Sequence, residues 1–472
     1  MNRSRLLGAT AALVLGAAGI TVAARGDTMT LGIGTQDTTT NTVNSGAVVR
    51  ELHLFEKYLP KTGRYANTKF ELEWQNYTSG PPITNGMIAN KLQFGSMGDY
   101  PAIFNGYSFQ NNPESKGYMI GVTAYNISGA GNGIVVHKDS PYYAIDDLKG
   151  KLITVPYGSA AHGMLLKAMQ DRGWKEDFWQ LANQAPEVGS TNLQEKKIDA
   201  HADFVPFAEL LPFRGFARKI FDGVEVKSPT FHSVLVRQEF ADKNPEIVVA
   251  YLKAMIEATN WIKADPKRAA EKIEEWTKIS KEVVYMFLGP GGIMTMDPTI
   301  KPELVAADKV GADVLRRLDR IKEFDIDKWV TDRFMRQAFV ELGLDYDKQL
   351  KSYDNYEVTG SDPFCNTPIE APRKAGQIWV KGGDITAYSS PRCTLAALAD
   401  LKKKGQAAGV VFLYDAALGI KLFADQAFYA IKPGAVAEIT PFLLKKDAEA
   451  EAQKSGGKVG TFTDAMAAVA GS

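Results

Sequence analysis

The chain has 472 residues, of which 45% are hydrophobic and 23% are charged, so it is long enough and apolar enough to bury more than one core. Lysine and arginine together number 55, the same as aspartate and glutamate together. This balance provides no net field that would attract nucleic acid or an anionic membrane surface. We therefore expect a folded protein of about three domains at ~150 residues each, with no nucleic acid and no membrane surface as its partner.

The N-terminus has the pattern of a secretory signal peptide. Two arginines precede an uncharged, mostly apolar run over residues 6–22, which leads into the small residues Ala23 and Ala24. We expect residues 1–24 to be removed, so that the mature chain starts near Arg25 in the periplasm. The alternative is an uncleaved membrane anchor, but no charged stop-transfer segment follows the apolar run. No cysteine lies near the expected cleavage site, so lipid attachment there is excluded.

The first three hundred residues alternate short apolar runs with amphipathic helical patterns, which is typical of sheets built from βαβ units. We expect strands over 29–33, 69–74, 94–97, 133–137 and 152–155. We expect helices over 47–58, 83–90, 159–171 and 245–264. Gly173 stands where a C-terminal cap would end the third of these helices. The fold class predicted for this region is α/β.

Two glycine-rich or polar passages, 128–132 and 227–232, bracket a self-contained βα pattern. We expect them to be crossings between two lobes, because a few backbone torsions in such segments absorb the rotation that closes a cleft. Ordinary surface loops are the alternative. The prediction divides the chain into lobe one over 25–127, lobe two over 128–230 and a return to lobe one over 231–345.

Several stretches of this region carry a resemblance to a known family. They are 79–82 with 92–101, 157–162, 197–200 with 203–207, and 234–236 with 244–246. In this order they resemble the nitrate, sulfonate and taurine-type periplasmic binding proteins, a superfamily that also includes binders of thiamine pyrimidine precursors; Lys197 breaks the family's pattern. The resemblance implies a two-lobed periplasmic binding protein (type II, Venus-flytrap), a monomer that delivers a small molecule to the permease of an ABC transporter.

The start of the expected helix at 159–171 is a candidate anion site. Gly158 permits a tight approach, Ser159 is a good N-cap, and the free amides of the first turn, up to that of His162, carry the positive end of the helix dipole. Such a site suits a sulfonate, nitrate, phosphonate or carboxylate. The alternative is that Ser159 only caps its own helix and that His162 packs locally.

Further candidates follow the expected strands, because ligands bind at the carboxyl ends of strands in open α/β sheets. A carboxylate at Asp99 or Asp203 would select an ammonium group or another hydrogen-bond donor, as in an aminosulfonate, although Asp99 fits equally well in a turn closed by its own side chain. The complete set of candidate ligand-binding residues is Thr35, Gln36, Thr78, Ser79, Ser96, Met97, Asp99, Tyr157, Gly158, Ser159, His162 and Asp203.

Patterns that would indicate an enzyme are missing from the sequence. The five histidines are separate, with no H-x-x-x-H pair, and neither a Walker-type loop nor a nucleophile elbow is present. The superfamily's pyrimidine-building enzyme is characterised by a run of cysteines, and this chain has no such run. We therefore expect a binding protein that catalyses no reaction and needs no cofactor.

Beyond residue 345 the character of the sequence changes. Residues 346–362 are polar with little apolar periodicity, which is typical of a linker. Residues 363–472 are expected to form an additional small α+β domain. In it we expect strands over 377–380 and 427–431, and helices over 394–404, 446–453 and 462–469.

The last hundred residues carry a second resemblance. The matching stretches are 375–380, 388–392, 427–431, 441–442, 447–450 and 456–459. They run in the order of the nitrous oxide reductase accessory (NosL) family of periplasmic copper-handling proteins. That family binds Cu(I) through a Cys-x-Met pair, whereas here Cys365 is followed by Asn366 and Thr367, so the methionine is missing.

The two cysteines, Cys365 and Cys393, allow two interpretations. They form a disulfide in an oxidising periplasm, or their thiolates hold Cu(I), with Met466 as a further ligand. We favour the disulfide, because the compartment is oxidising, the methionine of the copper pair is missing and the tail contains no histidine.

Taken together, these patterns predict the capture of a small organic anion, a sulfonate or a related sulfur compound, by closure of two lobes. The alternative function is periplasmic copper or metal delivery through the domain at 363–472.

Overall fold

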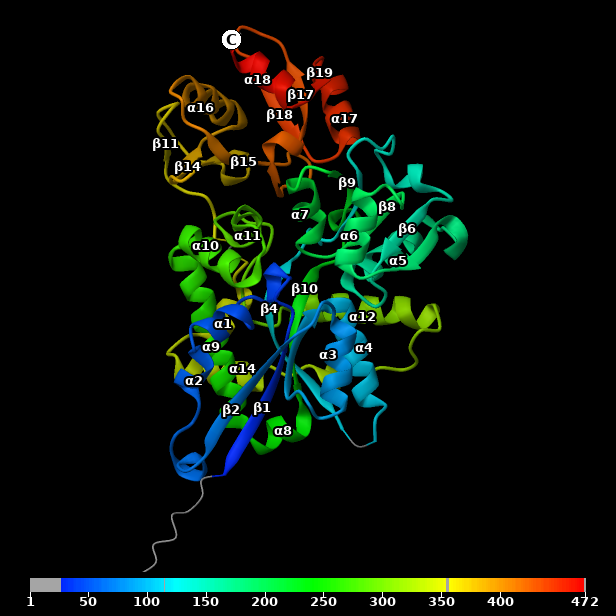
Figure 1. Cartoon of the computed structure of the whole chain (residues 1–472), viewed down its shortest axis with the longest axis vertical. Coiled ribbons are helices and arrows are strands. Elements are labelled where there is room, and N and C mark those ends of the chain that lie inside the picture. The colour runs from blue at the N-terminus through cyan, green and yellow to red at the C-terminus, as the bar shows by residue number, and fades with distance from the viewer. Residues whose placement is uncertain (1–26, 114, 354–355, 471–472) are drawn as a thin grey trace, which may run out of the picture.

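The structure is a computed structural model of the chain, and it describes residues 27–113, 115–353 and 356–470. The expected signal peptide at 1–24 lies outside the described residues. The molecule is elongated (Figure 1), and its C-terminal residues lie at the end opposite to the start of the first strand, β1 (Thr28–Thr35). Three parts follow one another along the long axis, each built on its own sheet or sheets.

The first sheet forms the part that we call the first lobe. Its strands stand in the order β2-β1-β3-β10-β4. They are β1, β2 (Lys69–Asn76), β3 (Phe94–Gly98), β4 (Gly117–Asn126) and β10 (Thr230–Arg237). β1 is parallel to β2 and β3, whereas β10 is antiparallel to β3 and β4. The strands expected over 29–33, 69–74 and 94–97 are present, and the stretch 234–236, whose family resemblance implied a strand re-entering lobe one, lies in the fully buried β10, whereas β4 was not expected.

The second sheet forms the second lobe, with the strand order β7-β6-β8-β5-β9. Its strands are β5 (Gly133–His137), β6 (Leu152–Val155), β7 (Gln180–Asn183), β8 (Ala200–Asp203) and β9 (Ala217–Asp222). β6 is parallel to β7 and β8, and β5 is antiparallel to β8 and β9. The strands expected over 133–137 and 152–155 are confirmed with these bounds.

Two segments connect the lobes. The first joins β4 to β5, and the second runs from the short 3-10 helix η5 (Gly223–Val226) into β10. They pack against each other: Gly129 has φ +94, and a Cβ atom there would lie 2.4 Å from the backbone oxygen of Ser228. The sequence predicted a crossing between the lobes over 227–232. Residues 230–232 instead pair within the first sheet as the start of β10.

Helices cover both sheets. They are α1 (Ala47–Glu51), α2 (Leu54–Tyr58), α3 (Gly80–Ile88), α4 (Asp99–Gln110), α5 (Ala160–Arg172), α6 (Pro186–Gln194), α7 (Phe207–Phe213), α8 (Gln238–Lys243), α9 (Pro245–Ala264), α10 (Pro266–Thr277), α11 (Lys281–Leu288), α12 (Pro302–Arg317), α13 (Ile326–Trp329), α14 (Arg333–Glu341) and α15 (Tyr346–Lys351). The bounds of α9 are those expected from the sequence. The single helix expected over 47–58 was wrong: His53 adopts a left-handed conformation (φ 51) that separates α1 from α2. Among the described residues, no helix combines the length and the apolar character needed to cross a membrane.

The C-terminal part has a four-stranded sheet in the order β14-β13-β15-β16 and a three-stranded sheet in the order β18-β17-β19. Its elements are β11 (Ser361–Asp362), β12 (Thr367–Pro368), β13 (Gly376–Val380), β14 (Ile385–Tyr388), β15 (Ala408–Tyr414), β16 (Lys421–Phe423), β17 (Phe428–Lys432), β18 (Glu438–Phe442), β19 (Lys458–Gly460), α16 (Pro391–Lys403), α17 (Lys445–Ser455) and α18 (Phe462–Ala470). All five elements expected here are present, with ends that differ by a few residues. The expected linker at 346–362 contains α15.

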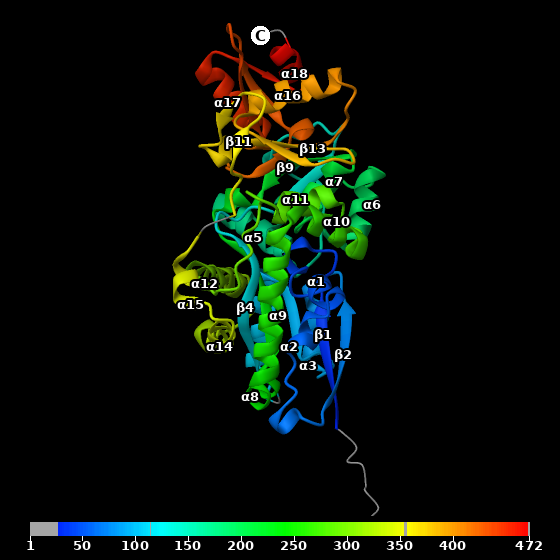
Figure 2. The same ribbon diagram turned by 90° about the vertical axis from the view of Figure 1, so that its left-hand side faces the viewer.

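The C-terminal part packs on the rest of the molecule near α7 and α11 (Figure 2). Lys421 is fully buried at this contact, and its ammonium donates to Gln377 Oε1 at 2.8 Å, while Gln377 Nε2 and the hydroxyl of Tyr285 on α11 are 2.9 Å apart. On the second lobe, Lys446 forms an ion pair with Glu225 of η5 at 2.5 Å. The C-terminal part is therefore attached to α11 and to the second lobe.

Candidate functional site

A small pocket lies where the two lobes meet, and we call it the anion pocket. Its lining residues are Gln36, Gly80, Gly98, Pro101, Ser159, Ala160, Phe204 and His232. The lobes approach closely around it, since a Cβ atom at Gly98 of the first lobe would lie 3.3 Å from the Cβ atom of Ala160 on the second lobe. The remaining volume is ≈ 10 Å³, which is room for about one water molecule. The two lobes thus approach closely at this point and leave little free space between them.

Three helices begin at the anion pocket. Gly80 is the first residue of α3, Gly98 is the N-cap of α4, and Ser159 is the N-cap of α5. The first-turn N–H groups of a helix have no partner within the helix, and the positive end of its dipole lies there. Two prolines follow Gly80, so the Gly80 N–H is the main donor at the start of α3, and Ala160 supplies one at the start of α5. The N–H groups offered to the pocket thus come from α3 and α5 and favour a negatively charged group there, whereas at the start of α4 the N–H of Tyr100 is taken by the side chain of Asp99.

The loop after β1 adds polar side chains with unmet hydrogen bonds. Gln36 is 3% exposed, and its Oε1 atom has no hydrogen-bond partner among the described residues. In the same loop the hydroxyl groups of Thr38 and Thr39 are buried, and neither has a partner within the part of the chain that the structure describes. Buried polar atoms in folded proteins nearly always have a partner, and each one left without costs about 1–3 kcal/mol. These atoms at the carboxyl end of β1 therefore indicate a polar ligand or water at this place.

His232 contributes a neutral hydrogen-bond donor. Its Nδ1 atom lies 3.2 Å from Nδ2 of Asn41, so with the amide nitrogen as donor the ring accepts at Nδ1 and carries its proton on Nε2. Burial lowers the pKa of His232 to about 3. The Nε2 atom lies on the side of Gly98, 3.7 Å from the position of a Cβ there. None of the pocket's lining residues is an aspartate, glutamate, lysine or arginine, so the donors to an anion are all uncharged.

Some of the predicted ligand residues lie together at this pocket and others do not. Gln36 and Ser159 line it, and Ser79 is the N-cap of α3 directly before Gly80. Thr35 lies at the end of β1, where its hydroxyl donates to Asp37 Oδ1 at 2.9 Å. Thr78 is exposed.

The residues around the start of α5 are used mainly within the second lobe. The hydroxyl oxygen of Ser159 accepts from the N–H of His162 at 3.3 Å, so Ser159 both caps its helix and lines the pocket. The ring of His162 accepts from the N–H of Gly158 at 3.1 Å and stacks on Tyr157, with the ring centroids 4.8 Å apart. Burial lowers the pKa of His162 to about 4. His162 and Tyr157 do not line the anion pocket, and we leave them out of the candidate site.

Three further residues predicted to bind ligand are buried away from the anion pocket. Asp203 has no exposed surface; its Oδ2 atom is 2.9 Å from Nε2 of His201, and its Oδ1 atom accepts from the N–H of Phe204. Met97 is fully buried in the core of the first lobe. Ser96 is also buried, 2.9 Å from the hydroxyl of Ser45.

Asp99 faces a different cavity. Its Oδ1 atom accepts from the N–H of Tyr100 at 2.6 Å, which is the local turn that the sequence allowed as an alternative, and Oδ2 accepts from the N–H of Phe231 at 3.4 Å. The carboxyl group lines a neighbouring pocket, which shares only Ala160 with the anion pocket.

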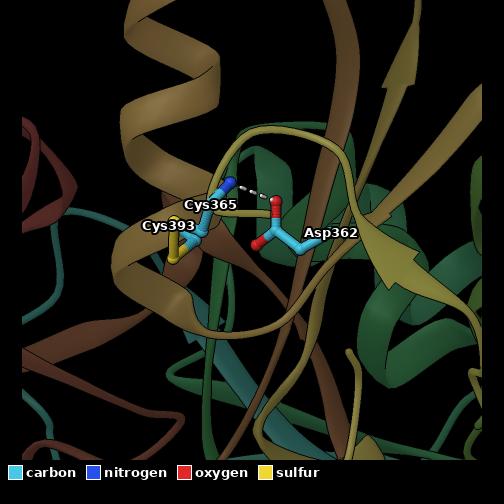
Figure 3. A group of neighbouring side chains, drawn as sticks. All are labelled: Asp362, Cys365 and Cys393. Carbon is cyan, nitrogen blue, oxygen red and sulfur yellow. Dashed lines mark hydrogen bonds between the residues drawn. A yellow bond between two sulfur atoms is a disulfide. The ribbon is translucent and has the colours of Figure 1, made fainter. Parts of the chain in front are cut away.

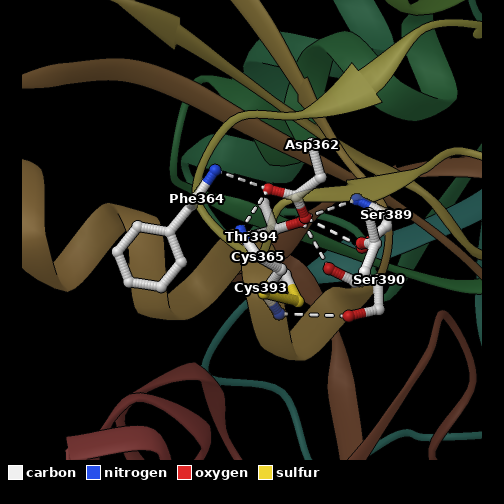
Figure 4. The surroundings of a disulfide bond; sticks show 8 residues. Asp362, Phe364, Cys365, Ser389, Ser390, Cys393 and Thr394 are labelled. Carbon is white, nitrogen blue, oxygen red and sulfur yellow. Dashed lines mark hydrogen bonds between the residues drawn. A yellow bond between two sulfur atoms is a disulfide. The ribbon is translucent and has the colours of Figure 1, made fainter.

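The two cysteines form a disulfide, Cys365–Cys393 (Figure 3). Beside it, Asp362 accepts hydrogen bonds from the N–H groups of Phe364, Cys365 and Ser389 and from the hydroxyl of Ser389, each at 2.8 Å (Figure 4). Burial acts to raise the pKa of Asp362, but these hydrogen bonds outweigh it and lower the pKa. The disulfide consumes both sulfur ligands and the carboxylate is fully engaged, so these residues do not fit a Cu(I) site.

Comparison with known proteins places the fold. Residues 112–269 match the family described as NMT1/THI5 like. A Bacillus subtilis (strain 168) protein named for binding aliphatic sulfonates is 27% identical over 300 residues, which cover 62% of this chain and 84% of the relative. The taurine-binding periplasmic protein of Escherichia coli (strain K12) is 23% identical over 280 residues, 56% of this chain and 84% of that protein.

The alkanesulfonate-binding protein SsuA from Xanthomonas axonopodis pv. citri, solved with bound MOPS, has a TM-score of 0.53 at 19% identity, covering 64% of this chain and 98% of that chain. The chain therefore has the α/β fold of periplasmic solute-binding proteins, with extra C-terminal sheets and helices. The desulfurization enzyme DszB matches this fold too, with a TM-score of 0.50 at 15% identity over 66% of this chain and 99% of that chain. The fold alone does not separate binding proteins from enzymes.

Proposed function

We propose that the protein is the periplasmic solute-binding component of an ABC importer and that it captures a small organic anion, a sulfonate or a related sulfur compound, between its lobes. The observation that carries this proposal is the convergence of three helix starts on a pocket whose lining holds no charged side chain. The names of the relatives support a sulfonate as the anion.

A sulfonate matches the donors of the anion pocket. Its three oxygens share one negative charge, and donors are available to the pocket from the first turns of α3 and α5, from Nε2 of His232 and, with the amide turned so that its nitrogen faces the pocket, from Gln36. Helix dipoles and neutral N–H groups can bind such an anion without a positively charged side chain. The lining also holds no carboxylate that would repel the anion. The organic part of the ligand would lie toward Pro101 and Phe204, the apolar lining residues from opposite lobes.

Ligand capture and release would follow from lobe rotation. The donors come from both lobes, so an anion binds the closed arrangement more tightly than the open one and shifts the population toward it. The two crossing segments are the places where backbone torsions can absorb this rotation. A permease would then distinguish the loaded from the empty protein by the relative position of the lobes.

The proposal is tested by isothermal titration of the purified protein with 1-propanesulfonate, taurine, nitrate and acetate. We expect saturable binding of at least one sulfonate, and a loss of about tenfold or more in affinity for Gln36→Leu, which keeps the volume of the side chain and removes its donors. Gln337→Leu on the exposed face of α14 is the matched control and is expected to bind as the wild type does. Binding of no anion, or equal affinities in both variants, would overturn the proposal.

A further inference from the structure

A second pocket lies next to the anion pocket, where α4 and α12 of the first lobe meet α5 of the second lobe and the two crossing segments. We call it the hinge pocket. Its volume is ≈ 70 Å³, enough for a few water molecules or a small organic ion. The polar groups in its lining include Asp99, Asn132, Thr230 and Asp308.

Two side chains in the hinge pocket carry polar atoms without a protein partner. Asp308 is 1% exposed, and over the described ranges 27–113, 115–353 and 356–470 neither of its carboxyl oxygens has a hydrogen-bond partner. Asn132 is 5% exposed; its Nδ2 atom donates to the hydroxyl of Thr230 at 3.1 Å, but its Oδ1 atom has no partner among the residues that the structure describes. The unmet atoms of a carboxylate and of an amide oxygen are acceptors, so what complements them is a donor.

Asp99 adds a second carboxyl group to the same pocket. Burial raises the pKa of Asp99 to about 6, and burial together with repulsion from Asp99 raises the pKa of Asp308 well above its usual value. Both shifts would be reversed by a positive charge placed between the carboxyl groups. The one cation in the lining, Lys167, is already paired with Asp171.

The rest of the lining decides which kind of cation fits. It is largely apolar, with Ile103, Met164, Phe231 and Val314 among its side chains. Calcium takes six to eight oxygen ligands, and magnesium takes six and keeps several waters, whereas this pocket offers two carboxyl groups and one amide oxygen against hydrocarbon. An ammonium group on a short alkyl chain supplies both the donors and the apolar surface.

We propose that the hinge pocket binds the ammonium group of a small aliphatic amine, with Asp308, Asp99 and the Oδ1 atom of Asn132 as acceptors. The alkyl chain lies against the apolar wall. Because α4 and α12 come from the first lobe and α5 from the second, an amine bound here also holds the lobes in the closed arrangement. The site is separate from the anion pocket and does not depend on the identity of the anion.

The test is an isothermal titration of the full-length purified protein with propylammonium chloride at pH 7, with 1-propanol as a neutral probe of the same length. We expect saturable binding of propylammonium and none of propanol. The pKa of Asp99 is about 6 and a bound cation lowers it, so titrations at pH 6 in two buffers with different ionisation heats are expected to show net proton release. Absence of saturable propylammonium binding, or equal binding of propanol, would overturn the proposal.

Two variants on the same helix sharpen the test. Asp308→Asn keeps the shape of the side chain and is expected to lower propylammonium affinity about tenfold or more. Asp313→Asn is the control and is expected to leave the affinity unchanged, because Asp313 is partly exposed and pairs with Arg316 and Arg317. Equal losses in both variants would contradict the proposal. If Asp308→Asn fails to fold, the pH dependence of propylammonium binding to the wild type tests the proposal instead. The affinity must rise between pH 5 and 8, and an affinity independent of pH overturns the proposal. Titration with 1-propanesulfonate separately reports whether the anion pocket is intact.

Discussion

Replacing both Cys365 and Cys393 by serine removes the crosslink of the C-terminal part while keeping side chains of similar size. The bond closes a loop of 28 residues, and a loop of this length contributes about 3.6 kcal/mol at 25 °C in the chain-entropy treatment. The turn around Cys365 is held by Asp362, and the N–H of Cys393 donates to the hydroxyl of Ser390 at 3.1 Å. These hydrogen bonds persist in the variant, so the loss is expected to come mainly from the freer unfolded chain.

The assay is calorimetric unfolding of the wild type and the double variant, with and without reductant. For a part of about a hundred residues, 1 kcal/mol shifts the melting temperature by roughly 4–8 °C, so the transition of the C-terminal part is expected to fall by roughly 15–30 °C. Reductant is expected to lower the wild-type transition in the same way and to leave the variant unchanged. A loss below about 1 kcal/mol would refute the reasoning.

Three further substitutions test burial and closure. Lys219→Met leaves the buried carboxyl groups of Glu209 and Asp222 without their cation, so we expect about 3–5 kcal/mol of destabilisation in urea unfolding, and an unchanged midpoint would contradict this. His232→Asn removes a ring that is buried in its neutral form. Because its folded pKa is depressed to about 3, its contribution to stability is complete above the unfolded pKa of about 6.5 and declines as the pH falls below it, by about 1.4 kcal/mol per pH unit. The difference in unfolding free energy between wild type and this variant is thus expected to shrink by about 2 kcal/mol from pH 8 to 5, and a constant difference would rule out the neutral buried ring. Gly98→Val places methyl groups between the lobes; we expect anion affinity to fall about tenfold with little change in melting temperature, and an unaltered affinity would argue against closure at this point.

Elements with local signals were predictable from the sequence. The helix α9 and the caps Ser159 and Gly173 follow from apolar periodicity and from residue types that suit helix ends. The break at His53 was not predictable, because a histidine in the left-handed conformation has no distinctive local pattern.

The candidate site was only partly predictable, because its contacts join distant segments. His232 was overlooked as a donor, since its partner Asn41 lies 191 residues away in the chain. Asp203 was misassigned, although the sequence held a clue: His201 and Asp203 are two apart on one strand, so their side chains lie on the same face and pair there. For the cysteines, spacing alone left disulfide and copper site open, and the disulfide bond present in the fold decided between them.

The central claim is that a small organic anion binds where α3, α4 and α5 begin. The most direct measurement is a crystal structure of the protein with 1-propanesulfonate. We expect sulfonate oxygens within hydrogen-bond distance of the N–H groups of Gly80 and Ala160 and of Nε2 of His232, between the two lobes. A sulfonate bound away from these helix starts, or a pocket that stays empty at saturating ligand, would contradict it.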